Sequence, residues 1–276
     1  MDRKIIFLDI DGTLTDPGTN VPPQSALTAI RSAKKKGHYV FLCTGRNYEM
    51  LSPLLKYGFD GVVASSGGYI ECNKQVIYDC PMTEDQRVRV LTTLEKNGVF
   101  RTVECMDGSY TDEGFKIFLK EKAQYDGNSD LLRWREQLEK SLNILPMEKY
   151  QQQPVYKVVI MCNDEKNLEA PKALLGDEFH FCVQGMDKHG IINGEIVNKK
   201  FDKGQAVKRV CAHLNIPVED TFGFGDSMND FEMLKTVGFS ICMSNGSDEL
   251  KKVADDICPS VREGGIYRSF IKYGLM

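Results

Sequence analysis

The sequence lacks any apolar run long enough to cross a membrane. Its first apolar run, residues 5–8, ends at Asp9. This run is too short for the core of a signal peptide, and no later run approaches the roughly 18 residues that a membrane helix needs. We therefore expect a cytoplasmic protein that has no membrane partner.

An excess of positive charge is also lacking. Lys and Arg number 35 against 39 Asp and Glu, which gives a formal net charge of -4. Without a global positive field, a nucleic acid is not an expected partner. Of the 276 residues, 42% are hydrophobic and 27% are charged, so collagen-like and disordered classes are excluded. The length predicts one or two domains.

The nine cysteines include no CxxC pair. Their number is odd, and most of them lie inside apolar runs such as residues 40–43. This pattern is typical of reduced cysteines that pack in the core of a protein from a reducing compartment.

The two ends of the chain alternate apolar runs with amphipathic helical patterns. Strands are predicted at residues 4–10, 39–43, 61–64, 221–225 and 239–243. Nearly continuous apolar runs are typical of strands covered on both faces, as in a parallel sheet. The alternation therefore predicts an α/β fold whose core is a doubly wound, Rossmann-like parallel sheet.

The middle of the chain breaks this alternation. A hairpin is predicted at residues 69–78, and from Met82 to about Gly185 helical patterns such as 85–97 mix with strand patterns such as 156–161. We predict that residues 1–81 and 186–276 form one discontinuous core domain. Residues 82–185 then form an inserted α+β domain.

Charged and polar side chains follow the predicted strands. Asp9 and Asp11 come after the first strand, and Thr44 comes after the second. Beyond the insertion, Lys203 opens a predicted helix and the string Gly225-Asp226-Ser227-Met228-Asn229-Asp230 follows a strand. Ligands of open α/β sheets bind outside the carboxyl ends of the strands, so these residues are the first candidates for function.

The carboxylates in this set predict a hard divalent cation. Asp9 and Asp11 are expected to point to the same side, where Asp226 would add further negative charge. Oxygen ligands without histidine favour magnesium, which commonly bridges carboxylates to a substrate phosphate. With such an ion, Asp9 can attack phosphorus while Lys203 holds the remaining charge, and Asp11 can protonate the leaving oxygen.

Each pattern alone has a simpler interpretation. Asp11-Gly12 is a common turn pair, Thr44-Gly45-Arg46 is typical of a strand-to-helix turn, and a lysine before a helix is usually a solvated charge. The string from Gly225 to Asp230 is also typical of a capped helix start. Their occurrence in this order, each at a predicted strand end or helix start, favours the chemical interpretation.

These motifs resemble those of a known family. Asp9-Ile10-Asp11-Gly12-Thr13-Leu14 and the string from Gly225 to Asp230 resemble the first and fourth motifs of haloacid dehalogenase (HAD) superfamily phosphatases, and Thr44 and Lys203 fit the second and third. The insertion has the position and size of the C2-type cap of the Cof-type group, class IIB. One departure is the stretch Ser65-Ser66-Gly67-Gly68 after the third predicted strand, where relatives often carry an Asn-Gly pair.

The resemblance implies a magnesium-dependent phosphatase that works through an aspartyl-phosphate. It makes Asp9 the nucleophile and Asp11 the general acid and base. Magnesium would be held by the carboxylates of Asp9 and Asp226 and the main-chain carbonyl of Asp11, with Asp230 supporting this metal shell. The side chains of Thr44, Lys203 and Asn229 would contact the phosphate. The main-chain N–H groups of Ile10 and Gly45 would also donate to it.

The implied substrate is a small phosphorylated metabolite, such as a sugar or cofactor phosphate. The cap offers four charged or aromatic candidates for substrate contact, Arg101, Tyr110, Lys116 and Lys157. Two alternatives stay open: a phosphomutase of the phosphomannomutase-like kind on the same scaffold, and a non-catalytic module that binds a phosphorylated ligand. The sequence indicates no oligomeric state.

Overall fold

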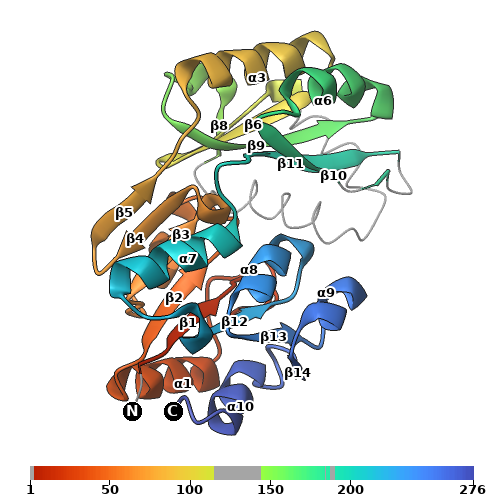
Figure 1. Ribbon diagram of the computed structural model, residues 1–276. Helices are drawn as coiled ribbons and strands as arrows, with labels where there is room; N and C mark the ends of the chain where they lie inside the picture. Colours follow the sequence, from red (N-terminus) through yellow and green to blue (C-terminus); the bar gives the residue numbers. More distant parts are fainter. Residues whose placement is uncertain (1–2, 115–143, 184, 187–189) are drawn as a thin grey trace. The chain divides into compact units, whose positions relative to one another are not determined.

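The computed structural model describes residues 3–114, 144–183, 185–186 and 190–276 (Figure 1). The chain divides into two compact units. The first unit comprises residues 1–46, 51–79 and 201–276, and the second comprises residues 47–50 and 80–200.

The first unit is built on one eight-stranded sheet. Its order is β14-β13-β12-β1-β2-β3-β4-β5, and all neighbours from β14 to β3 pair in parallel, whereas β4 and β5 add an antiparallel hairpin. The strands are β1 (Ile5–Leu8), β2 (Tyr39–Cys43), β3 (Gly61–Ala64), β4 (Tyr69–Cys72), β5 (Gln75–Asp79), β12 (Thr221–Gly225), β13 (Phe239–Met243) and β14 (Asp256–Cys258). The predicted α/β fold with a mainly parallel core sheet is confirmed.

Helices cover both faces of this sheet (Figure 1). On one face, α7 (Lys203–Leu214) and α8 (Phe231–Thr236) bury residues such as Val207 and Leu234 against Phe7 and Phe41 of the strands. On the other, α1 (Gln24–Lys35) packs beside α10 (Gly265–Lys272), and Phe270 of α10 contacts Phe224 of β12. The shorter α2 (Ser52–Leu55) and α9 (Asp248–Val253) lie in connections. Because helices cover both faces of the sheet, the ends of the strands are the place where polar side chains can gather.

The second unit contains a mixed sheet with the order β10-β11-β9-β6-β7-β8. Helices α3 (Glu84–Lys96) and α6 (Glu169–Leu175) contact each other, and residues of both pack in one apolar core with the strands (Figure 1). The strands are β6 (Phe100–Cys105), β7 (Gly108–Thr111), β8 (Ile144–Pro146), β9 (Val155–Cys162), β10 (Phe179–Val183) and β11 (Ile192–Asn198). This helix-backed sheet forms the inserted cap.

The second unit continues beyond the return point that the sequence predicted at Gly185. Strand β11 pairs with both β10 and β9, so it lies inside the mixed sheet, and the first unit resumes only at Phe201. Residues 192–198 carry Asn193 and Gly194, which locally favour turns, and their strand conformation comes from pairing on both sides.

A close approach between α7 and α8 explains the glycine that follows Lys203. A Cβ atom on Gly204 would lie 2.4 Å from the carbonyl oxygen of Glu232 and 2.6 Å from Oγ1 of Thr236. We expect Gly204→Ala to lower the free energy of unfolding by about 1–3 kcal/mol, although alanine is the better helix former.

Thermal unfolding measures this effect. The matched control is Gly185→Ala, where a Cβ would meet nothing within 4 Å. Equal melting temperatures for the two variants would show that the helices are not in tight contact at Gly204.

Candidate active site

Asp9 lies at the point where β1 meets its neighbour β12. The side chain follows directly after β1 and is 4% exposed, and its main-chain N–H donates to the carbonyl oxygen of Phe224 at 3.0 Å. Because β1 and β12 run in parallel, this pairing brings their carboxyl ends together. Asp9 therefore lies beside the loop that starts at Asp226.

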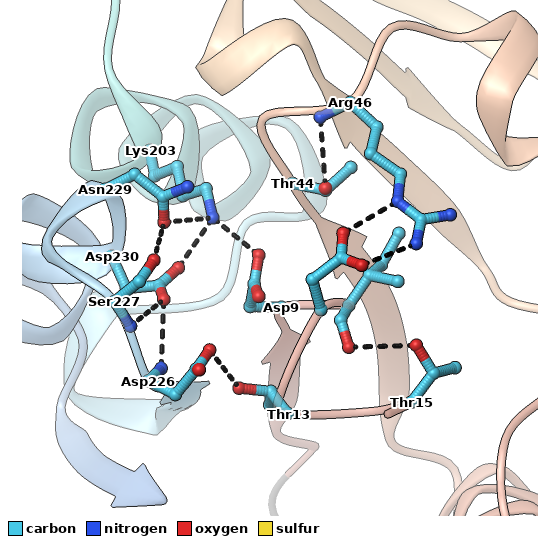
Figure 2. Close-up of polar contacts among 12 residues, drawn as sticks. Asp9, Thr13, Thr15, Thr44, Arg46, Lys203, Asp226, Ser227, Asn229 and Asp230 are labelled. Atoms are coloured by element: carbon cyan, nitrogen blue, oxygen red, sulfur yellow. Dashed lines mark hydrogen bonds and ion pairs between the residues drawn. The ribbon is translucent and has the colours of Figure 1, made fainter. Parts of the chain in front are cut away.

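Lys203 joins this edge from the first turn of α7. The turn is capped by Asp202, whose side chain accepts from the N–H of Gln205. The Lys203 side chain is fully buried, and its ammonium donates to Asp9 Oδ1 at 2.7 Å, to Asp230 Oδ1 at 2.6 Å and to Asn229 Oδ1 at 3.2 Å (Figure 2). One cation thus connects the first, third and fourth motifs.

Three carboxylates gather around this ammonium. Oxygen atoms of Asp9, Asp226 and Asp230 lie within 4.8 Å of one another, and no other group of this kind is found in the part of the chain that the structure describes. Both oxygens of Asp230 have partners, since Oδ1 accepts from Lys203 and Oδ2 accepts from the main-chain N–H groups of Asp226 and Ser227. Asp226 accepts from Thr13 and Asn245, each at 3.2 Å.

The electrostatics of this cluster show an excess of negative charge. Burial, followed by repulsion from Asp230, raises the pKa of Asp9 well above its ordinary value. The same two causes raise the pKa of Asp226 to about 7. Burial opposes the charge of Lys203, but the carboxylates of Asp230 and Asp9 outweigh it and raise the pKa of the ammonium.

A divalent cation fits this donor set. The cluster supplies only oxygen ligands, and one ammonium cannot neutralise three carboxylates. The buried cluster of Asp9, Asp226 and Asp230 is therefore consistent with a divalent metal site.

The glycine of the first motif is required by the same crowding. Gly12 has a φ of +82°, and a Cβ there would lie 2.2 Å from Asp226 Oδ2. A side chain at this position would strain the backbone and displace the Asp226 carboxylate. Glycine lets the loop after β1 approach the loop after β12.

Asp11 has hydrogen-bond partners that differ from those of Asp9. Its carboxylate accepts two hydrogen bonds from the guanidinium of Arg46, Nε to Oδ2 and Nη2 to Oδ1, both at 2.8 Å. Strand β1 ends at Leu8, so the alternation of a strand no longer governs side-chain direction at Asp11. Arg46 is a site residue that the sequence analysis quoted in Thr44-Gly45-Arg46 but to which it gave no role.

The predicted phosphate contacts take these positions. Thr44 is 2% exposed and its hydroxyl accepts from the N–H of Arg46 at 3.1 Å, while Gly45 lies between them in the chain. Ile10 is buried after β1, and its carbonyl accepts from the main-chain N–H groups of the turn that follows. Asn229 is exposed, and its Oδ1 accepts from both Lys203 and Ser227 (Figure 2).

The structure also adds Thr13 and Asn245, which contact Asp226. Thr13 lies within the first motif, whereas no sequence signal marks Asn245.

Three of the four cap candidates have protein partners. Arg101 makes a two-point ion pair with Asp112, and Tyr110 donates to Asp107 at 3.0 Å. Lys157 is buried between Glu104 and Glu195. Lys116 lies outside the described residues.

The chain belongs to the haloacid dehalogenase-like hydrolases, whose family model matches residues 6–270. The Bacillus subtilis protein YkrA is 27% identical over 285 residues, which cover 100% of both chains. A phosphoglycolate phosphatase of Methanobrevibacter smithii is 26% identical over 277 residues, again covering 100% of both. The solved structure of the HAD subclass IIB sugar phosphatase BT4131 aligns with a TM-score of 0.76 at 22% identity, over 99% of this chain and 100% of that chain.

These comparisons make the protein a HAD-type phosphatase, a phosphoric monoester hydrolase with an inserted cap. Its substrates are accordingly phosphorylated small molecules. All nine cysteines are free thiols. Within the described ranges, no helix is both long enough and apolar enough to span a membrane.

The raised pKa of Asp226 predicts how the stability of the metal-free protein depends on pH. A proton held with a pKa of about 7 in the folded state, against an ordinary value of 3.8, stabilises the fold fully below the ordinary value, and this stabilisation is lost as the pH rises through 7. The melting temperature should therefore fall between pH 5 and pH 8. In Asp226→Asn this fall should be smaller by on the order of 5 °C.

Thermal melts in the presence of a chelator test this expectation. The control variant is Asp248→Asn, whose carboxylate is 86% exposed, and it should keep the wild-type profile. A fall of the same size in Asp226→Asn and the wild type would contradict the buried-charge interpretation.

Proposed function

We propose that the protein is a magnesium-dependent phosphatase that hydrolyses small phosphorylated metabolites through an aspartyl-phosphate on Asp9. The observation that carries this proposal is the buried ammonium of Lys203, which contacts Asp9 and Asp230 beside Asp226. A site of this kind combines a nucleophilic carboxylate, a fixed positive charge and oxygen ligands for a metal.

Asp9, Asp226 and the main-chain carbonyl of Asp11 would hold the magnesium ion. When bound, the ion neutralises the phosphoryl oxygens so that an anionic carboxylate can approach phosphorus. Asp230 suits a supporting role, because both of its oxygens already accept hydrogen bonds from Lys203 and from main-chain N–H groups. These bonds fix the loop that carries Asp226.

In the first half of the reaction, an oxygen of Asp9 attacks phosphorus and the bond from phosphorus to the leaving oxygen breaks. Asp11 donates a proton to that oxygen, which leaves as an alcohol, and the phosphoryl group stays on Asp9. Lys203, Thr44 and Asn229, together with the main-chain N–H groups of Ile10 and Gly45, would hold the phosphoryl oxygens.

In the second half, water attacks the phosphorus of the aspartyl-phosphate. Asp11, now a carboxylate, takes a proton from this water, and the bond between phosphorus and the Asp9 oxygen breaks. Inorganic phosphate leaves, Asp9 is again an unmodified side chain, and Asp11 has regained the proton that it donated in the first half.

We assign substrate recognition to the inserted cap, as the sequence analysis expected. The relatives' names indicate different substrates, phosphoglycolate for one and a sugar phosphate for the other. The proposed substrate class is therefore small phosphorylated metabolites, with sugar and cofactor phosphates as the first to assay.

Asp9→Asn should abolish turnover, because an amide cannot attack phosphorus. The variant should stay folded and should melt at a higher temperature than the wild type without metal, since it removes a buried carboxylate whose pKa is raised. Hydrolysis of p-nitrophenyl phosphate with magnesium measures the loss. Near-normal hydrolysis by this variant would rule out a covalent intermediate on Asp9.

Asp11→Asn should slow hydrolysis to a degree that depends on the leaving group. Phenol leaves poorly without a proton, whereas p-nitrophenolate needs little help, so the loss in kcat/KM, which reports the first half of the reaction, should be about 10²-fold or more on phenyl phosphate and much smaller on p-nitrophenyl phosphate. Steady-state kinetics on both esters provide the measurement. Equal losses would remove the acid role from Asp11.

A further inference from the structure

Arg46 holds the carboxylate of Asp11 by both oxygens. Nε lies 2.8 Å from Oδ2 and Nη2 lies 2.8 Å from Oδ1. The two side chains are largely buried, at 7% and 13% exposed. A two-point contact between a planar guanidinium and a planar carboxylate fixes the plane of the carboxylate as well as its distance.

The rest of Arg46 is held from several sides. Nη1 donates to Asn20 Oδ1 at 2.5 Å, and Nη2 also donates to the carbonyl of Thr19 at 3.2 Å. At the main chain, the N–H donates to the hydroxyl of Thr44 at 3.1 Å, and the carbonyl accepts from the N–H of Ser65 at 2.8 Å. The guanidinium is therefore a rigid support for Asp11.

This support has a conformational cost in the loop after β3. Ser65 and Ser66 adopt φ angles of 48° and 58°, a left-handed region that serine rarely occupies. The main-chain N–H of Ser65 donates to the carbonyl of Arg46, and the main-chain N–H of Ser66 donates to the carbonyl of Thr44 at 2.9 Å. The hydrogen bonds of this strained turn therefore hold the main chain at Thr44 and Arg46 in place. Backbone strain of this kind is typical of functional sites.

We propose that Arg46 is a positioning residue, which sets the orientation of Asp11 for proton transfer to the leaving oxygen and from water. This inference rests on the acid and base role of Asp11 proposed above. A role in stability alone explains the pair less well, because a buried ion pair is weak evidence for stability, whereas its two-point geometry provides orientation. Lysine in place of Arg46 would keep the positive charge but could not make the two-point contact with the carboxylate.

The test is Arg46→Lys assayed on phenyl phosphate and p-nitrophenyl phosphate with magnesium. We expect kcat/KM on phenyl phosphate to fall about tenfold or more and kcat/KM on p-nitrophenyl phosphate to fall much less, since kcat/KM reports the first half of the reaction, in which only the first ester needs a well-oriented acid. KM should not rise for either ester, because Arg46 acts through Asp11. In an Asp11→Asn background, Arg46→Lys should leave the ratio of the two kcat/KM values unchanged.

Arg89→Lys is the matched control. Arg89 also makes a two-point ion pair in the second unit, with Nε to Asp85 Oδ2 at 2.8 Å and Nη2 to Glu178 Oε1. Losing that pair should leave the ratio of the two kcat/KM values at the wild-type value. If Arg46→Lys fails to fold, Asn20→Ala removes the partner of Nη1 instead, and it should shift the ratio in the same direction by a smaller factor.

The outcomes separate the two hypotheses. If Asp11→Asn shows no dependence on the leaving group, the proposed acid role fails. If Asp11→Asn shows that dependence and Arg46→Lys loses equally on both esters, or raises KM for both, the positioning role of Arg46 is overturned while the proposed function stands. An unchanged ratio in Arg46→Lys and in Asn20→Ala overturns the positioning role in the same way.

Discussion

The structure of the active site depends on one buried ammonium, that of Lys203. Two like charges about 4 Å apart repel by about 4 kcal/mol at an effective dielectric constant of 20, so the buried carboxylates of Asp9, Asp226 and Asp230 would oppose the meeting of their loops. Lys203 contacts two of the three and brings them together from α7. One ammonium does not balance three carboxylates, and burial together with repulsion from Asp230 raises the pKa values of Asp9 and Asp226. The fold thereby maintains a site that favours a further cation.

Two aspartates that are neighbours in the first motif acquire different properties from different cations. The Lys203 ammonium, which acts as a point charge, donates to one oxygen of Asp9. This contact does not constrain the other oxygen of the carboxylate. Asp11 contacts a fork, the Arg46 guanidinium, which constrains both oxygens. A nucleophile needs a charged environment that lets it approach phosphorus, whereas a proton donor needs a fixed direction. The two pairings match the two roles that we propose.

The sequence predicted most of the core sheet but only part of the cap, for a physical reason. In the cap, the predicted helix 85–97 and strand 156–161 agree with α3 and β9 to within one residue, whereas β6 and β11 were not predicted. Strands at residues 39–43 and 61–64 are apolar throughout because helices cover both faces of the core, and their bounds agree with the structure. Strand β11, with Ile-Asn-Gly-Glu-Ile-Val-Asn, and β6, with Thr102 and Glu104, place polar residues between the apolar residues that pack in the core with the helices. Pairing with neighbouring strands, which local sequence does not encode, makes them strands.

A similar limit applies to the candidate site. Motif order predicted that Asp9, Thr44, Lys203 and Asp226 gather at one edge, because the carboxyl ends of parallel strands meet there. It did not predict the partner of Asp11, since the chain has already left β1 and Arg46 lies 35 positions further along. Beyond a strand end, side-chain direction is set by tertiary contacts. In this protein those contacts extend through Arg46 to the strained turn at Ser65 and Ser66, whose main-chain N–H groups donate to the carbonyls of Arg46 and Thr44. The stretch Ser65-Ser66-Gly67-Gly68 departs from the pattern that the resemblance implied. It supports Arg46, and thereby the pair with Asp11, through main-chain hydrogen bonds that do not require an asparagine side chain.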